Sequence, residues 1–301
     1  MTNNNNNNQN DKHRNTRRPL KPVPLLSGIE EIRQDLEERI AQGDTVYGIE
    51  ILDEAVETIR KGSITFVVAE QNTGKSLIGQ IIACNLAKQG KKVMICTCEM
   101  GAGLLMERQI KTLTGISAKK LKDLYEKQRD TANYVMDSLI EDKTYAYLNN
   151  IDICETGGAF IEDIIEMLDG FPEYEYIVVD YIQRIKGTGS EYENVTYASR
   201  ELQTYARDTG KRIVVCSQAG RQSQNDAKYG KEKDGTRIKG KGSGSIEEDA
   251  DVVITLMGVE ESEGRKILIT LTKNRYGHIK NITYKYSLDE RLNLRLECRS
   301  A

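Results

Sequence analysis

The stretch ITFVVAEQNTGKSLIGQIIACNLAK, residues 64–88, decides the fold. It opens with an apolar run rich in β-branched residues at 64–69, and it ends with a helical pattern at 75–88. Gly90 stands where the stop of that helix is expected. Between strand and helix lies AEQNTGKS, residues 69–76. A strand, a short loop ending in Gly-Lys-Ser and a helix are the setting that a phosphate-binding loop, or P-loop, requires.

In a P-loop the backbone N–H groups surround the phosphates of a nucleotide, and the helix N-terminus adds a partial positive charge. Gly74 permits the backbone conformation, Lys75 should reach the β- and γ-phosphates, and Ser76 should bind Mg²⁺. Ala69 replaces the usual first glycine, which is a mild departure. The predicted nucleotide site is formed by Glu70, Gln71, Asn72, Thr73, Gly74, Lys75 and Ser76.

Four more apolar runs follow along the chain, at 93–98, 176–180, 213–217 and 252–256. Helical patterns separate the first four of the five runs. Strands that alternate with helices predict an α/β fold with a mostly parallel central sheet flanked by helices. Beyond residue 264 the pattern changes, and it predicts a C-terminal extension of antiparallel strands at 267–271, 282–286 and 292–296.

Two carboxylates follow predicted strands. Asp180 ends the run 176–180, and Glu99 comes directly after the run 93–98. Because parallel sheets bind ligands at the carboxyl ends of their strands, both side chains are expected near the P-loop. An aspartate there holds Mg²⁺ in P-loop enzymes, and a glutamate there can orient and polarise an attacking water. Taken alone, an aspartate such as Asp180 after a strand is more often a helix cap, and Glu99 fits the first turn of a helix equally well.

The composition of the 301-residue chain, 38% hydrophobic and 30% charged, is typical of a soluble globular protein. The N-terminus has no apolar core of the signal-peptide kind, so we expect a cytoplasmic protein. A net charge of −3 argues against a uniformly basic nucleic-acid binder but allows a local basic channel. Cys96 and Cys98 lack the second pair of ligands that a structural zinc site takes.

The N-terminal region predicts two segments ahead of the main domain at 45–301. Residues 1–27 combine an asparagine run with basic residues and prolines, and such a composition predicts a disordered tail. An apolar stripe then predicts an amphipathic helix at 28–42, and Gly43 follows as its stop. Its own domain and a neighbouring subunit are the two candidates for the surface on which this helix packs.

The motifs become specific as a series. After the P-loop come CEM at 98–100, VVDYIQ at 178–183, VVCSQ at 214–218, GSIEEDADVVITL at 244–256 and KNRYG at 273–277. This order resembles the RecA-like motor domain of the DnaB-type replicative DNA helicases over about residues 45–300. The helix at 28–42 resembles the linker helix of that family. The segment SIEEDAD, 245–251, is the most diagnostic, because a generic ATPase does not need it.

The resemblance implies ATP and Mg²⁺ as cofactors, and it implies a role for each motif residue. Glu99 matches the catalytic base, Asp180 the magnesium-linked acid, and Gln218 the residue that senses the γ-phosphate and couples it to DNA. Lys273 and Arg275 match a pair that reaches into the ATP site of the neighbouring subunit, with Arg275 as the arginine finger. Without the resemblance, both would read as surface charges at a strand end.

Two loops on the crevice side are expected to contact DNA. The first, 183–194, carries Arg184 and Lys186. The second, 219–242, has seven basic and three acidic residues, a local charge of +4. The resemblance implies that these loops line a central pore along the backbone of one DNA strand, whereas a solvated insert is the alternative. The predicted contacts in the second loop are Arg221, Lys228, Lys231, Lys239 and Lys241.

The resemblance favours an ATP-dependent 5′–3′ DNA helicase acting in DNA replication as a homo-oligomeric ring, with a hexamer expected. Single-stranded DNA is the implied partner, with primase or a helicase loader as further partners. We expect a compact phage- or plasmid-type motor without the helical N-terminal domain usual in bacterial replicative helicases. A recombination or annealing ATPase that binds single-stranded DNA without unwinding it is the second reading. A regulatory subunit of a host helicase ring is the third, and the intact Lys75 and Glu99 argue against it.

Overall fold

A computed structural model describes residues 24–219, 243–262, 264–277 and 281–300. They fall into two compact units, divided between Asp44 and Thr45. The described part of the first unit contains a 3-10 turn, η2 (Leu25–Ser27), and the helix α1 (Gly28–Gln42), which has the bounds that its sequence pattern predicts. Most of the predicted tail at 1–27 lies outside the described residues. Within the described ranges, none of the helices combines the length and the apolar character that a membrane span needs.

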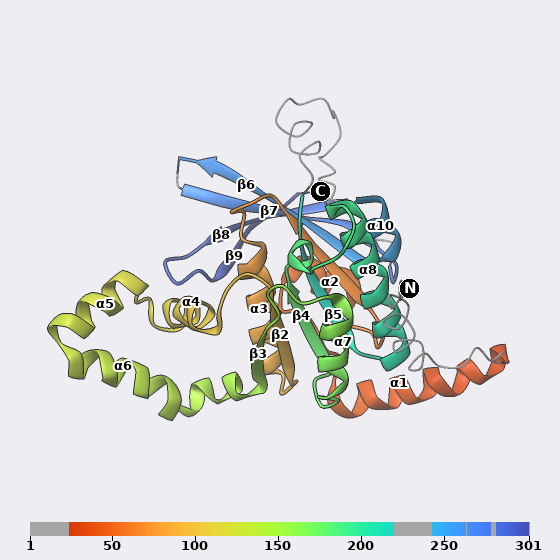
Figure 1. The fold of residues 1–301 in the computed structure, drawn as a ribbon, viewed down its shortest axis with the longest axis horizontal. Coiled ribbons are helices and arrows are strands. Elements are labelled where there is room, and N and C mark those ends of the chain that lie inside the picture. The colour runs from red at the N-terminus through yellow and green to blue at the C-terminus, as the bar shows by residue number, and fades with distance from the viewer. Residues whose placement is uncertain (1–23, 220–242, 263, 278–280, 301) are drawn as a thin grey trace, which may run out of the picture. The chain divides into compact units, whose positions relative to one another are not determined.

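The second unit is built on one sheet, to which the described residues contribute nine strands in the order β3-β2-β4-β5-β1-β6-β7-β8-β9 (Figure 1). Pairing is parallel from β3 to β6 and antiparallel from β6 to β9. The strands are β1 (Ile64–Ala69), β2 (Val93–Thr97), β3 (Ile151–Glu155), β4 (Tyr176–Asp180), β5 (Arg212–Gln218), β6 (Val252–Glu261), β7 (Gly264–Asn274), β8 (Ile282–Leu288) and β9 (Leu294–Ser300).

Helices cover both faces of the parallel part of the sheet. Val67 and Ala69 of β1 belong to one core, which includes Ile78 and Ile82 of α3, and Phe66 belongs to the other core with residues of α7 and α8. Because both faces are covered, all six residues of β1 are buried, and all except Thr65 are apolar. The helices are α2 (Glu50–Val56), α3 (Lys75–Lys88), α4 (Ala102–Thr114), α5 (Ala118–Lys127), α6 (Arg129–Glu141), α7 (Ile161–Asp169), α8 (Glu191–Thr209) and α10 (Ser243–Asp249), with 3-10 turns η3 (Lys143–Asn150) and η4 (Ile182–Arg184).

Gly79 lets α3 lie unusually close to the sheet. A Cβ atom at this position would lie 3.0 Å from Sγ of Cys216 on β5 and 3.3 Å from a methyl group of Val178 on β4. Both neighbours belong to buried strands that cannot easily move. This close packing fixes the helix that begins directly after the P-loop.

The predicted α/β class, with a parallel core and an antiparallel extension, is confirmed. The strand β3 was not predicted, because Asp152 and Glu155 interrupt its apolar pattern, and both are exposed at the sheet edge. The last strand starts two residues later than predicted, at Leu294. Leu292 has φ +64 in the preceding turn, where the carboxylate of Asp289 accepts the N–H group of Asn293.

The topology brings the P-loop, Glu99, Asp180 and Gln218 to one edge of the sheet. The P-loop follows β1, Glu99 follows β2, and Asp180 and Gln218 end β4 and β5. Thr97 lies opposite Asp180 in the β2–β4 register, and Ala69 lies opposite Gln218 in the β1–β5 register. The carboxyl ends of four neighbouring strands therefore form this edge, as expected for ligand binding by a parallel sheet.

Candidate functional site

The P-loop turns sharply into α3 at Gly74. This glycine has φ +105 and ψ +19, a conformation that side-chain-bearing residues rarely adopt, and its carbonyl accepts the N–H group of Ile78 as α3 begins. The next residue, Lys75, places its ammonium group 4.2 Å from the centre of the Tyr181 ring. Such a cation–π contact holds the lysine at the site through a weak interaction that a phosphate can replace.

Ser76 and Asp180 meet across the site. The Ser76 hydroxyl donates to Oδ1 of Asp180 at 3.0 Å, although the two residues are 104 positions apart in the sequence. Asp180 is 6% exposed, and burial raises the pKa of its carboxyl group, against the opposing effects of Ser76, Lys75 and Arg108. A buried carboxylate with a hydroxyl beside it gains most from a bound cation.

Glu99 lies on a turn that Thr97 braces. The Thr97 hydroxyl donates to the carbonyl of Met100 at 2.6 Å and accepts the N–H group of the same residue at 3.1 Å. The Glu99 side chain is about half exposed, and Nη2 of Arg184 approaches its Oε1 at 3.3 Å. Arg184, predicted as a DNA contact, therefore lies against the predicted catalytic base.

Arg108 on α4 also lies at this site, although it is not among the residues that the sequence predicts. Its Nη1 is buried without a hydrogen-bond partner among the described residues, and its Nη2 contacts the sulfur of Met100 at 3.4 Å. Burial lowers the pKa of this guanidinium, whereas the charge of Asp180 raises it. A partly buried guanidinium whose buried Nη1 lacks a hydrogen-bond partner, close to the charge of Asp180, indicates a position for an anionic ligand. The available signal was its place nine residues after Glu99, on the helix that follows the motif CEM.

Gln218 is connected to the loop after β4 through Gln183. The N–H group of Gln218 donates to Oε1 of Gln183 at 3.0 Å, and Nε2 of Gln183 donates to the Ser217 hydroxyl at 2.8 Å. The end of β5 and the end of β4 are thus held together one strand away from the P-loop. A displacement of either strand end would therefore strain the contacts of the other.

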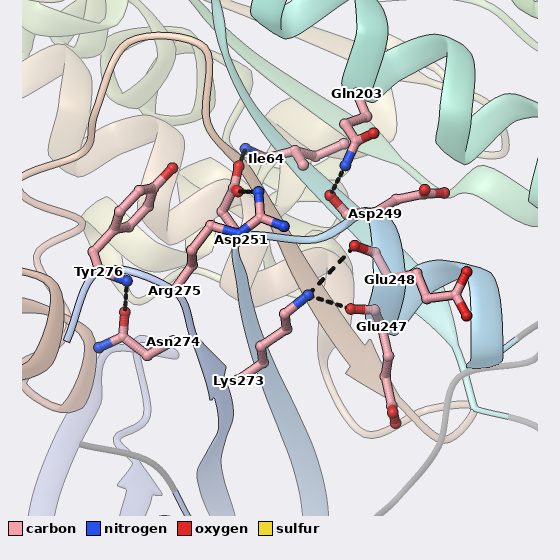
Figure 2. A network of polar contacts seen from close by, with 10 residues as sticks. All are labelled: Ile64, Gln203, Glu247, Glu248, Asp249, Asp251, Lys273, Asn274, Arg275 and Tyr276. Atoms are coloured by element: carbon pink, nitrogen blue, oxygen red, sulfur yellow. Dashed lines mark hydrogen bonds and ion pairs between the residues drawn. The ribbon is translucent and has the colours of Figure 1, made fainter. Parts of the chain in front are cut away.

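Lys273 and Arg275 are not brought to this edge. They lie at the far end of β7, where Lys273 pairs with Val253 near the start of β6, and Arg275 donates to Asp251 at 2.6 Å (Figure 2). Asp251 accepts the N–H group of Ile64, the first residue of β1. At about 3.3 Å per residue, the length of β1 puts roughly 16 Å or more between this end and the P-loop of the same chain.

Comparison with known families decides the assignment. The family model of the DnaB-like helicase C-terminal domain matches residues 46–291. The chain belongs to this family. Membership in the DnaB-like family implies nucleotide binding, and the matched range contains every predicted site residue.

Curated relatives include a "Probable plasmid replicative DNA helicase" of Chlamydia trachomatis serovar L2, 29% identical over 240 residues, which are 77% of this chain and 50% of the relative. The "Replicative DNA helicase DnaB" of Geobacillus stearothermophilus is 27% identical over 267 residues, 84% of this chain and 56% of the relative. The chain therefore spans about half the length of the curated DnaB relatives that it matches.

Solved structures share the DnaB-type fold. A structure described as an ATPase domain superposes with a TM-score of 0.73 at 19% identity, over 91% of this chain and 99% of that one. "The Structure Of A DnaB-Like Replicative Helicase And Its Interactions With Primase" gives a TM-score of 0.70 at 21% identity, over 91% of this chain and 67% of the other. At such identities the likeness concerns the fold alone.

The residues at the site fit a magnesium–nucleotide complex. Ser76 and Asp180 supply a hydroxyl and a carboxylate, the hard oxygen ligands that Mg²⁺ takes. Lys75 and the orphaned Nη1 of Arg108 supply positive charge beside them. The donor set of this DnaB-like domain is therefore suited to a phosphate chain with its metal ion.

The predicted DNA contacts are only partly described. Lys186 follows η4 and is exposed, with its ammonium group 5.0 Å from the centre of the Phe160 ring. Its N–H group donates to the carbonyl of Ala159 at 2.8 Å. The other predicted contacts of the DnaB-like domain, Arg221, Lys228, Lys231, Lys239 and Lys241, lie outside the described residues.

Proposed function

We propose that this chain is the motor of an ATP-dependent 5′–3′ DNA helicase that acts in DNA replication as a homo-oligomeric ring on single-stranded DNA. The observation that carries the proposal is the contact between Ser76 and Asp180, with Glu99 on the neighbouring strand end, in a chain of the DnaB-like family. Relatives named as replicative helicases support the assignment to replication. Such a motor would act in the cytoplasm.

Each residue at the sheet edge has a part in ATP hydrolysis under this proposal. Lys75 and the P-loop N–H groups bind the β- and γ-phosphates, and Ser76 and Asp180 hold Mg²⁺, which neutralises phosphate charge when bound. Glu99 accepts a proton from the attacking water, a contribution of about 10²–10⁴-fold in rate. Arg108 donates to the γ-phosphate, which gives its buried Nη1 a partner.

Arg275 and Lys273 complete the ATP site of a neighbouring subunit. The length of β1 separates them from the P-loop of their own chain, so they can act on a phosphate only across an interface. The helix α1 supports an assembly as well, because a lone helix cannot bury its own apolar stripe. We propose residues 28–44 as a linker between neighbouring subunits and 45–301 as the motor domain, with a hexamer as the expected ring.

Single-stranded DNA is proposed to follow the loops after β4 and β5. Arg184 and Lys186 begin the first of them at the site edge. Gln218 ends β5 opposite Ala69, the first residue of the P-loop, and so connects the nucleotide to the residues that follow β5. Primase or a helicase loader is a further proposed partner.

Strand displacement on forked DNA tests this function. Duplexes with a single 5′ tail, a single 3′ tail or both are mixed with the protein and ATP–Mg²⁺, and Glu99→Gln serves as the inactive control. We expect ATP-dependent displacement that requires the 5′ tail. ATP turnover stimulated by single-stranded DNA but without displacement would indicate an annealing ATPase, and absence of turnover would indicate a regulatory subunit.

A further inference from the structure

The carboxylate of Asp251 is the centre of a buried polar network at the end of the sheet opposite the P-loop (Figure 2). Asp251 is 3% exposed. Its Oδ1 accepts from Nη1 of Arg275 at 2.6 Å, and its Oδ2 accepts the N–H group of Ile64 at 3.0 Å. Backbone bonds join the same three residues, from Asp251 to the Ile64 carbonyl and from Arg275 to the Asp251 carbonyl, both at 2.9 Å.

This network ties three strands together at one point. Ile64 begins β1, Asp251 directly precedes β6, and Arg275 directly follows β7. The carboxylate is therefore anchored to the innermost part of the sheet, whereas the guanidinium that it holds belongs to the end of a strand. The buried carboxylate cannot move without breaking its contact with β1. It therefore restricts the position of the Arg275 guanidinium, which would otherwise move freely at the end of a flexible side chain.

Lys273 is held by the same segment of sequence. Its ammonium group donates to the carbonyls of Glu247 and Glu248 at the C-terminal end of α10, the second at 3.4 Å. Carbonyls at a helix C-terminus carry partial negative charge, which favours a cation there. The end of α10 is itself fixed to α8, since the Asp249 carboxylate accepts the Ser199 hydroxyl at 2.7 Å and the Asp249 carbonyl accepts from Gln203.

These contacts explain what the segment SIEEDAD at 245–251 does in the structure. Within the part of the chain that the structure describes, its acidic residues form no group that could hold a metal ion. Asp249 docks the segment on α8, the carbonyls that precede it hold Lys273, and Asp251 holds Arg275. Lys273 and Arg275 are two positions apart, and their positive charges repel each other. The α10 carbonyls hold the first and Asp251 holds the second, so one segment keeps both cations close together.

We propose that Asp251 is a positioning residue that aims Arg275 at the ATP bound to the neighbouring subunit. This inference rests on the proposed function, since it takes Arg275 as the finger. Asp251 engages one nitrogen of the guanidinium, and among the described residues no other side chain bonds to it. With the Arg275 side chain 45% exposed, the remaining donors are free to meet a phosphate across an interface.

Asp251→Asn tests the role with a minimal change. The asparagine oxygen can still accept from Ile64, but the amide group facing Arg275 no longer attracts it. ATP affinity should stay normal, because the P-loop of the same chain is untouched, while turnover should fall about 10²-fold, as for a reacting group misplaced by about 1 Å. Asp152→Asn on the edge strand β3, whose carboxylate accepts from the Tyr174 hydroxyl, is the control with the same chemical change, and it should leave turnover per folded subunit unchanged.

A double variant separates positioning from a general loss of structure. If Asp251 acts only through Arg275, then Asp251→Asn combined with Arg275→Ala should be no slower than Arg275→Ala alone. Additive losses would contradict the inference. If Asp251→Asn does not fold, Asp251→Glu replaces it, because the longer side chain keeps the charge and displaces the guanidinium, and the same loss is expected.

Mixed assemblies identify the subunit on which Asp251 acts. Asp251→Asn keeps an intact P-loop, and Lys75→Ala keeps an intact Asp251–Arg275 pair, so a mixture should regain turnover that neither variant has. A folding defect or a defect at the P-loop of the same chain could not be repaired in this way. Arg275→Ala with wild-type turnover would overturn the proposed function itself. A slow Arg275→Ala together with a fast Asp251→Asn would overturn this inference alone. So would an Asp251→Asn mixture that stays inactive while the corresponding mixture of Arg275→Ala with Lys75→Ala regains turnover.

Discussion

Arg184 and Glu99 form an ion pair, Nη2 to Oε1 at 3.3 Å, between the loop that follows β4 and the turn that follows β2. Arg184 also donates from Nε to the Tyr181 hydroxyl at 2.9 Å, and the ammonium group of Lys75 lies over the Tyr181 ring. The proposed base, a proposed DNA contact and the P-loop lysine are therefore linked through one tyrosine.

Because this ion pair is about half exposed on both sides, it contributes about 0–1 kcal/mol, and a DNA phosphate can replace the carboxylate. Arg184→Gln should therefore free Glu99 in the absence of DNA. DNA-free ATP turnover should rise by up to about fivefold, the factor that corresponds to about 1 kcal/mol, and stimulation by DNA should fall by the same factor. Lys186→Gln is the control, with weaker DNA binding and an unchanged DNA-free rate. An unchanged or lower DNA-free rate in Arg184→Gln would contradict the link.

Asp180→Asn should stabilise the nucleotide-free domain while it abolishes turnover. Burial raises the pKa of Asp180, so its ionised form costs stability at neutral pH. The amide removes that cost and can still accept from Ser76. The melting temperature should rise, by about 2–4 °C for each kcal/mol relieved. A lower melting temperature without nucleotide would show that the carboxylate is a net stabilising group.

The raised pKa of Asp180 also predicts how the stability of the folded domain changes with pH. Because its pKa is raised in the folded state, Asp180 binds a proton at a higher pH in the folded protein than in the unfolded chain. Its contribution to stability is therefore fully present below the unfolded pKa and is lost as the pH rises through the folded pKa. Comparing melting curves of wild type and Asp180→Asn should give a difference that shrinks as the pH falls from neutral, and a difference that grows would have the wrong sign.

Arg108→Gln should distinguish ATP from ADP. If Arg108 donates to the γ-phosphate, the variant should bind ADP normally, bind ATP more weakly and turn it over at least about tenfold more slowly, as expected for one lost charge-assisted hydrogen bond. Lys111→Gln on the same helix is the matched control and should leave both affinities unchanged. Equal weakening of ATP and ADP binding, measured by calorimetry, would place Arg108 away from the γ-phosphate.

The elements that the sequence predicts best are those whose signal is local. The strand at 64–69 and the helix at 75–88 have the predicted bounds. The reason is that neighbouring residues alone indicate both the burial of β1 and the turn at Gly74. The sequence did not predict β3, because an edge strand tolerates charged residues and these interrupt the apolar run that indicates a strand.

The contacts that define the site join residues that are far apart in the sequence. Glu99 and Arg184 are 85 residues apart, and Asp251, the partner of Arg275, lies 24 residues away, directly before β6. The sequence identifies the members of these pairs as motif residues, but only the strand order brings them together. The orphaned Nη1 of Arg108 depends on burial, which no short pattern around that arginine indicates.

The central claim is that each ATP site is shared by two subunits, and mixing two defective variants tests it most directly. Arg275→Ala should bind ATP about normally and hydrolyse it about 10³–10⁵-fold more slowly, as for other arginine fingers. Lys75→Ala should lose hydrolysis at its own P-loop while it keeps an intact Arg275. In rings assembled from both, we expect ATP turnover to return at interfaces that pair an intact P-loop with an intact finger. If mixed rings form, as shown by differently tagged subunits, and turnover stays at the level of the separate variants, Arg275 does not act across the interface and the shared-site account is contradicted.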